Sequence, residues 1–201
     1  MSVRRLHDVQ PDSFAFSEAN LARVNASIAK YPPGRQASAV ISALWIGQEQ
    51  QGWITKPMIE EIARLLDMPA IRVLEVATFY TMFHLAPVGR HHVQVCTTTP
   101  CWLRGSDDVV KACKKHIHPQ PHTVSPDGEF SWEEVECLGA CVNAPLIQVG
   151  ADTYEDLTGE KTADIIEALR RGETPKPGSQ TGRRSSEPDG GPTVLKKEVS
   201  S

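Results

Sequence analysis

The stretch Cys96-Thr-Thr-Thr-Pro-Cys101 has a distant counterpart, Cys137-Leu-Gly-Ala-Cys141, and together they contain four of the five cysteines of this 201-residue chain. The spacings are C-x4-C and C-x3-C, and 35 residues lie between Cys101 and Cys137. Thiolates that bind one inorganic centre are usually supplied two per loop, because one turn places two sulfurs and a second loop completes the ligand set. The layout is typical of a metal site.

Three other uses of the cysteines compete with an iron-sulfur centre. A disulfide framework belongs to small proteins of oxidising compartments, and this longer chain has an odd cysteine and no secretory hydrophobic segment. A thioredoxin-type redox pair needs C-x-x-C, which neither pair has. Structural zinc tolerates C-x2-4-C half-sites, so the spacing alone leaves zinc open.

The residues between the cysteines favour iron and sulfide over zinc. The threonines after Cys96 and the residues Gly139 and Ala140 are small, so backbone N–H groups can approach bridging sulfides. Hydrogen bonds to the sulfurs stabilise such clusters and help to set their potential. A plant-type ferredoxin also begins with C-x4-C, but C-x2-C follows at once there, and no cysteine follows Cys101 at that distance.

Three motifs resemble one known family. They are Glu75-Val-Ala-Thr-Phe-Tyr-Thr-Met-Phe83, Cys96-Thr-Thr-Thr-Pro-Cys101-Trp-Leu-Arg-Gly105-Ser and Glu136-Cys137-Leu-Gly-Ala-Cys141-Val-Asn-Ala-Pro145. In order and spacing they are similar to the thioredoxin-like 2Fe-2S subunit of respiratory complex I, the NADH:quinone oxidoreductase. The resemblance covers residues 17–171.

This resemblance implies one 2Fe-2S cluster with Cys96, Cys101, Cys137 and Cys141 as its ligands. It implies an electron-transfer subunit of the NADH dehydrogenase module, which accepts electrons from FMN in a partner flavoprotein subunit. We expect FMN and NADH on that partner only, because the sequence has no dinucleotide or Walker loop, and we expect no catalytic residue and no activity of the isolated chain. Relatives also serve NAD-linked hydrogenases and formate dehydrogenases, so the parent complex stays open, as does a zinc-stabilised interaction module.

Composition excludes several classes of protein. With 40% hydrophobic and 23% charged residues the chain can bury a core. The formal charge of −4 gives no basic footprint for nucleic acid. No apolar run approaches the ~20 residues of a membrane span, and the first residues do not resemble a transit peptide. Together with the resemblance, this predicts a cytoplasmic protein, peripheral on the cytoplasmic side of the inner membrane through its complex.

The expected fold is mixed α and β: a small N-terminal helical bundle followed by a thioredoxin-like 2Fe-2S ferredoxin domain. We expect an extension over residues 1–16, a helical lobe over 17–86, the ferredoxin domain over 87–172 and a disordered tail over 173–201. Apolar residues at helical spacing predict four helices in the lobe. Ser17 and Thr55 suit N-caps, and Pro69 suits the start of the fourth helix. Five residues are candidates for an exposed apolar edge: Trp45, Phe79, Tyr80, Met82 and Phe83.

In the second domain, period-two alternation over residues 91–96 predicts a strand that ends at Cys96. A helix is expected from Leu103, with Cys113 buried on its apolar face and not a ligand. Residues 123–125 and 130–132 flank a Pro-Asp-Gly turn and predict a hairpin, and residues 146–149 predict a second one. A last helix is expected between a Thr158 cap and Gly172, and the two cysteine loops should lie side by side at one end of the sheet.

The tail is rich in Pro, Gly and Ser and has few large apolar residues. Such a segment cannot bury enough surface to offset its ordering entropy, which is why disorder is expected there. A tail that becomes ordered against a partner is the functional alternative.

Overall fold

The structure is a computed structural model in which residues 4–184, 186–188, 190–191 and 194 are described. Its internal contacts divide the chain into two compact units, Met1–Val88 and Gly89–Ser201. The sequence had placed this boundary between residues 86 and 87. None of the helices in the described ranges is long and apolar enough to cross a membrane.

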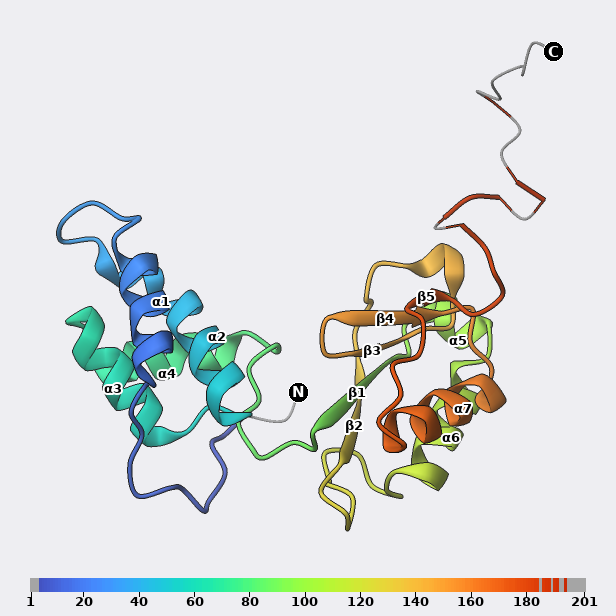
Figure 1. Cartoon of the computed structure of the whole chain (residues 1–201), viewed down its shortest axis with the longest axis horizontal. Helices are drawn as coiled ribbons and strands as arrows, with labels where there is room; N and C mark the ends of the chain where they lie inside the picture. The colour runs from blue at the N-terminus through green and yellow to red at the C-terminus, as the bar shows by residue number, and fades with distance from the viewer. Residues whose placement is uncertain (1–3, 185, 189, 192–193, 195–201) are drawn as a thin grey trace. The chain divides into compact units, whose positions relative to one another are not determined.

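The first unit is built from four α-helices and one short 3-10 helix (Figure 1). They are α1 (Glu18–Ile28), η1 (Gln36–Ala39), α2 (Val40–Gln51), α3 (Lys56–Leu66) and α4 (Ala70–Phe79). The predicted caps are confirmed: Ser17 accepts a hydrogen bond from the Asn20 N–H, and Thr55 accepts one from the Met58 N–H. Pro69 directly precedes α4, where its missing N–H costs no helical hydrogen bond.

The apolar faces of these helices form one core, which includes Leu44, Met58, Ile62 and Leu66. Four of the five predicted edge residues are exposed, namely Trp45, Phe79, Tyr80 and Met82. The fifth prediction is wrong, because Phe83 is fully buried in the core. The chain turns back after α4, where the Phe83 N–H donates to the Tyr80 carbonyl, and this turn directs the Phe83 ring inward.

The second unit contains a five-stranded mixed sheet of order β2-β1-β3-β4-β5. Its strands are β1 (His91–Cys96), β2 (Phe130–Val135), β3 (Ile147–Val149), β4 (Asp152–Glu155) and β5 (Gly178–Ser179). β1 and β2 are parallel, β3 is antiparallel to both β1 and β4, and β5 is parallel to β4. The predicted strand at residues 91–96 and the β3–β4 hairpin are confirmed.

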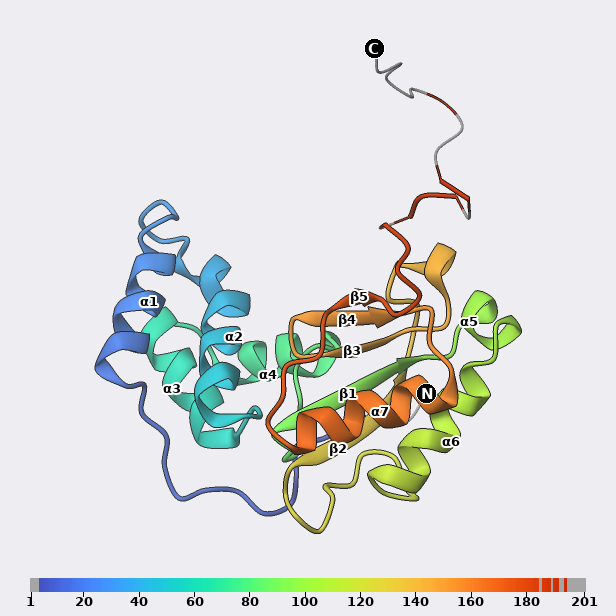
Figure 2. The ribbon, with the colours of Figure 1, turned by 45° about the vertical axis from the view of Figure 1, so that its right-hand side comes forward.

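One face of this sheet carries the core of the unit. The helices α6 (Ser106–His116) and α7 (Gly159–Arg170) lie side by side on it, as Figure 2 shows. Val93 and Val95 of β1 alternate inward there, together with Phe130 and Trp132 of β2. The cap of α7 is as predicted, since Thr158 accepts a hydrogen bond from the Lys161 N–H.

The single helix expected from Leu103 is instead two helices. A five-residue helix, α5 (Thr99–Leu103), comes first, and α6 begins only at Ser106. Gly105 separates them with a φ of +98°, a conformation that breaks a right-handed helix and that glycine adopts at little cost. The prediction failed because a helix of five residues is too short to show a helical period.

The hairpin expected around Pro126 to Gly128 does not form. Residues 123–125 are not a strand, and β2 pairs in parallel with β1 instead. The Ser125 hydroxyl accepts from the Phe130 N–H at 2.9 Å and donates to the Asp127 carboxylate, so the segment curls into a tight turn. The turn residues were recognised correctly, but the partner of β2 was not.

The tail also differs from the expected disorder. Gly178–Ser179 adds the edge strand β5 to β4, and the Gln180 N–H donates to the Glu155 carbonyl at 3.0 Å. Hydrogen bonds, rather than burial of large side chains, order this segment, and composition gives no signal of them. Within the predicted tail, residues 185, 189, 192–193 and 195–201 lie outside the described residues.

Candidate metal centre

The parallel pairing of β1 with β2 brings the two cysteine pairs to one end of the sheet. In the register of these strands Cys96 lies opposite Val135, the last residue of β2. Cys137 follows Val135 by two residues, so the second pair begins beside the place where the first pair begins. The predicted side-by-side placement of the two cysteine loops is confirmed.

The first pair is held by regular secondary structure. Cys96 is the last residue of β1, and its N–H donates to the Leu146 carbonyl at 3.2 Å. Cys101 lies on α5, which has Pro100 in its first turn, where proline is compatible with a helix. Both side chains are buried.

The second pair is held by an irregular loop, residues 136–144, which we call the second cysteine loop. Gly139 has a φ of +89°, which allows the tight turn between Cys137 and Cys141. The Sγ atoms of these two cysteines lie 3.3 Å apart, and both residues are exposed. The loop ends in the 3-10 turn η2 (Cys141–Asn143) and a cis Ala144–Pro145 peptide bond.

Backbone N–H groups point at the sulfurs of the first pair. Burial acts to raise the pKa of the Cys96 thiol, but hydrogen bonds from the N–H groups of Leu138 and Thr98 outweigh it, so that this pKa is lowered. Burial, the hydrogen bond with Cys96 and the Cys96 charge raise the pKa of Cys101 to about 12. The Gly139 N–H lies 3.4 Å from the Cys137 sulfur.

The four thiols are close enough to influence one another. The pKa of Cys141 is raised, first by its hydrogen bond with Cys137 and further by the negative charges of Cys137 and Cys96. Crowded thiols of this kind resist losing all their protons unless a cation compensates their charge. A set of four sulfur donors, surrounded by N–H groups and by the apolar residues Ala144 and Leu146, fits an iron-sulfur centre.

The fifth cysteine lies elsewhere. Cys113 is fully buried on α6, in the core formed with Val109 and the sheet. Burial raises the pKa of its thiol to about 12. Its predicted position on an apolar helix face is therefore confirmed.

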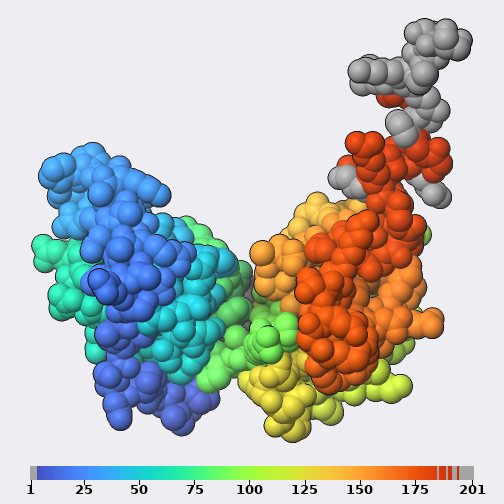
Figure 3. Space-filling model, viewed as in Figure 1, coloured from blue at the N-terminus to red at the C-terminus, as the bar shows by residue number. Residues whose placement is uncertain are grey.

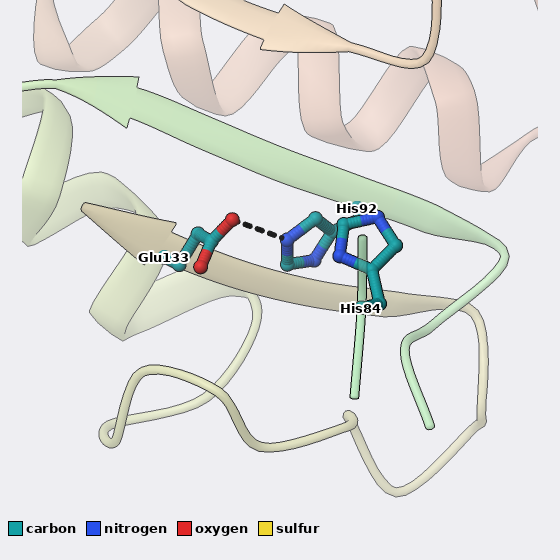
Figure 4. Close-up of side chains that lie close together, drawn as sticks. All are labelled: His84, His92 and Glu133. Atoms are coloured by element: carbon teal, nitrogen blue, oxygen red, sulfur yellow. Dashed lines mark hydrogen bonds and ion pairs between the residues drawn. The ribbon is translucent and has the colours of Figure 1, made fainter. Parts of the chain in front are cut away.

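A polar cluster lies on the other face of the β1–β2 pair. His92 contacts Glu133 at 3.1 Å between Nε2 and Oε1 (Figure 4), and its Nδ1 lies 2.7 Å from the Ser131 hydroxyl. Gln94 donates to the same Glu133 oxygen at 2.9 Å. Burial alone would raise the pKa of Glu133, but the hydrogen bonds from His92 and Gln94 lower it to about 2. His91 packs against Phe130 on the opposite face, as expected for adjacent strand residues.

Sequence reasoning missed the residues that hold the second cysteine loop. Asn143 donates from Nδ2 to a Glu155 carboxylate oxygen at 2.6 Å, and the Asp156 N–H donates to the Asn143 carbonyl at 2.8 Å. Arg183 donates to the Val142 carbonyl at 3.0 Å. Asn143 lies in a motif already singled out, but no pattern in the sequence pointed to Arg183.

Comparison with known proteins identifies the family. A family model described as thioredoxin-like [2Fe-2S] ferredoxin matches residues 24–170. The chain belongs to this family. Both the expected family and the expected mixed α and β fold class are thereby confirmed. The thioredoxin-like [2Fe-2S] ferredoxins carry a 2Fe-2S cluster, which is the cofactor that the sequence predicted.

Two relatives of this ferredoxin have names that describe a larger complex. A subunit of NADH-quinone oxidoreductase from Rhizobium meliloti (strain 1021) is 55% identical over 200 residues, which are 97% of this chain and 73% of the relative. A subunit of the same name from Rickettsia bellii (strain RML369-C) is 53% identical over 159 residues, 79% of this chain and 95% of the relative.

A solved structure shares the fold of the ferredoxin. An NAD+-reducing [NiFe]-hydrogenase in its H2-reduced state aligns with a TM-score of 0.58 and 16% sequence identity. The alignment covers 68% of this chain and 22% of the hydrogenase chain. At that identity the likeness describes the fold alone.

Proposed function

We propose that this ferredoxin is the 2Fe-2S electron-transfer subunit in the NADH dehydrogenase module of an NADH:quinone oxidoreductase. Cys96, Cys101, Cys137 and Cys141 bind its cluster. The convergence of these four thiols at one end of the sheet, with the fifth cysteine in the core, is the observation that supports the ligand set. The relatives that are more than half identical support the parent complex.

The chemistry that such a cluster supplies when bound is the transfer of single electrons. The residues of this chain hold four thiolates in place, direct N–H groups from Leu138, Thr98 and Gly139 at them, and surround them with apolar side chains. These donors favour the negatively charged state of the sulfurs. The electrons come from FMN on a partner flavoprotein subunit that binds NADH, and the complex keeps the chain on the cytoplasmic side of the inner membrane.

Metal and sulfide analysis of the anaerobically purified chain tests this function. We expect two irons and two acid-labile sulfides per chain, an EPR signal after one-electron reduction and no NADH oxidation without the flavoprotein. A colourless chain with one bound zinc contradicts the redox role and favours a zinc-stabilised interaction module. Co-purification with hydrogenase or formate dehydrogenase subunits, in place of quinone-reducing ones, assigns a different parent complex.

A further inference from the structure

The segment 178–184, which we call the C-terminal strap, runs from the edge of the sheet to the second cysteine loop. It begins as β5 on β4, with Gly178 opposite Tyr154 and Ser179 opposite Glu155. Figure 3 shows this orange-red end of the chain lying on the orange surface of its own unit. The strap lies beyond residues 24–170, the part that the family model matches. Its contacts are therefore not part of what defines the family.

Asp156 connects the strap to the loop. Its carboxylate accepts hydrogen bonds from the Ser179 hydroxyl at 2.6 Å and from the Thr181 hydroxyl at 3.3 Å. The same carboxylate lies 3.5 Å from a guanidinium nitrogen of Arg183, with only 9% of the Asp156 side chain exposed. The Asp156 N–H donates to the Asn143 carbonyl, so one residue contacts both segments.

Arg183 reaches the loop directly. Its Nη1 donates to the Val142 carbonyl at 3.0 Å, and its Nη2 donates to the Glu187 carbonyl at 2.7 Å. Val142 is the residue after Cys141, so the guanidinium fixes the backbone next to a cysteine that is itself exposed. A planar, permanently charged donor that bridges two carbonyls holds such a backbone more firmly than a flexible ammonium group.

We propose that Arg183 is a positioning residue for the second cysteine loop, a role that rests on the proposed ligation by Cys137 and Cys141. The guanidinium orders the turn that carries Cys141 and adds a fixed positive charge beside it. Reduction of a one-electron carrier adds negative charge, so a nearby cation favours the reduced state. Arg183 therefore raises the midpoint potential of the centre that the loop binds.

The test compares three variants of the full chain, Arg183→Gln, Arg183→Lys and Arg184→Gln. Arg184 is the matched control, because it is the neighbouring exposed arginine and its replacement removes the same charge. The first readout is the midpoint potential of the reconstituted chain. The second is amide hydrogen exchange of residues 141–144 in the metal-free chain, which needs no cluster.

We expect Arg183→Gln to have a more negative potential than the wild type and about tenfold faster exchange in the loop, as for loss of a hydrogen bond to a charged group. Arg183→Lys keeps the charge but not the bridge, so its potential stays near the wild type while its exchange accelerates. Arg184→Gln matches the wild type in both readouts. If Arg183→Gln matches Arg184→Gln in both, the positioning role is wrong.

The two proposals fail in different ways. A wild-type chain without iron and sulfide contradicts the ligation by the four cysteines, and the exchange measurement still decides whether Arg183 orders the loop. A wild-type chain with its cluster and unchanged readouts in Arg183→Gln contradicts only the role of Arg183. If Arg183→Gln takes up no cluster, faster loop exchange in its metal-free form supports the role, and wild-type exchange opposes it.

Discussion

The two cysteine pairs of this ferredoxin have the same expected task but different support. Cys96 and Cys101 are buried, the first at the end of a strand and the second on a helix. Cys137 and Cys141 are exposed on an irregular loop. Regular elements satisfy their own backbone hydrogen bonds, whereas a loop depends on partners from elsewhere in the chain.

The partners of the second pair come from distant positions in the sequence. Glu155 and Asp156 follow or end the β4 strand, and Arg183 belongs to the strap. One half of the site is thus part of the sheet, and the other half is attached to the sheet by side chains. The difference predicts which substitutions affect the whole site and which affect only one half.

Replacement of a ligand has the largest expected effect. We predict that alanine at Cys96, Cys101, Cys137 or Cys141 abolishes the 2Fe-2S absorption and EPR signals, because each removes one of four sulfurs. The matched control is Cys113→Ala, which keeps the spectrum and has at most a modest packing cost. A normal spectrum in one of the four variants, or loss of the spectrum in the control, contradicts the ligand assignment.

The melting temperature of the metal-free chain separates the two halves within the same variants. Cys101→Ala removes a fully buried side chain and should destabilise the metal-free chain by about 1 kcal/mol. Cys137→Ala removes an exposed side chain and should leave its melting temperature unchanged. Equal effects in these two variants contradict the difference in support.

Thiol reactivity is the second test of the comparison. In the metal-free chain we expect maleimide to modify Cys137 and Cys141 first, because both are exposed. Burial raises the pKa of Cys101 and Cys113 to about 12. Their reactive thiolate fraction at neutral pH is about a thousandfold below that of an ordinary thiol, before access is counted.

Mass spectrometry of peptides after timed maleimide addition measures this order. Cys113, which lies in the core and outside the site, is the internal reference for a buried thiol. If Cys101 reacts as fast as Cys137, the first half of the site is open in the metal-free chain, and the contrast between the halves depends on the cofactor.

The sequence predicted the elements that a regular pattern encodes. The caps at Ser17, Thr55 and Thr158 and the strand over residues 91–96 follow local rules, and each is present. Two cysteine pairs of suitable spacing likewise pointed to a shared centre before any strand pairing was known. These signals are local, so one sequence contains them in full.

The features that were missed depend on contacts between distant residues. β2 pairs with β1 rather than with the segment across its turn, and no local pattern distinguishes these partners. β5 has only two residues and is held by hydrogen bonds from Ser179 and Gln180. Composition describes how much apolar surface a segment can bury, and it misses a segment that polar contacts attach to an existing sheet.

A third prediction tests the support of the first half through pH. The pKa of Glu133 is lowered to about 2, so its contribution to stability is complete above its ordinary value of 4.5 and is lost as the pH falls toward 2. We expect this loss to be on the order of 2 kcal/mol for a partly buried carboxylate of this kind. It weakens the β1–β2 pair that ends at Cys96.

Chemical denaturation of the metal-free chain between pH 6 and pH 2.5 measures this contribution. Glu133→Gln should lower stability at pH 6 and make it depend less steeply on pH, whereas Glu134→Gln, an exposed neighbour on the same strand, should behave as the wild type. Identical pH profiles for Glu133→Gln and the wild type contradict a role for this carboxylate.

The smallest expected effect comes from the strap and concerns the second half alone. Composition alone predicted that removal of residues 173–201 changes neither the spectrum nor the melting. The contacts of Ser179, Thr181 and Arg183 predict otherwise: a chain that ends at residue 177 should lose about 1 kcal/mol of stability. Its maleimide reaction should accelerate at Cys137 and Cys141 but not at Cys96 and Cys101. A chain that ends at residue 191 keeps the strap and is the control, with wild-type melting and wild-type reactivity expected. Equal acceleration at all four cysteines in the shorter chain means that the strap stabilises the whole sheet and not one loop.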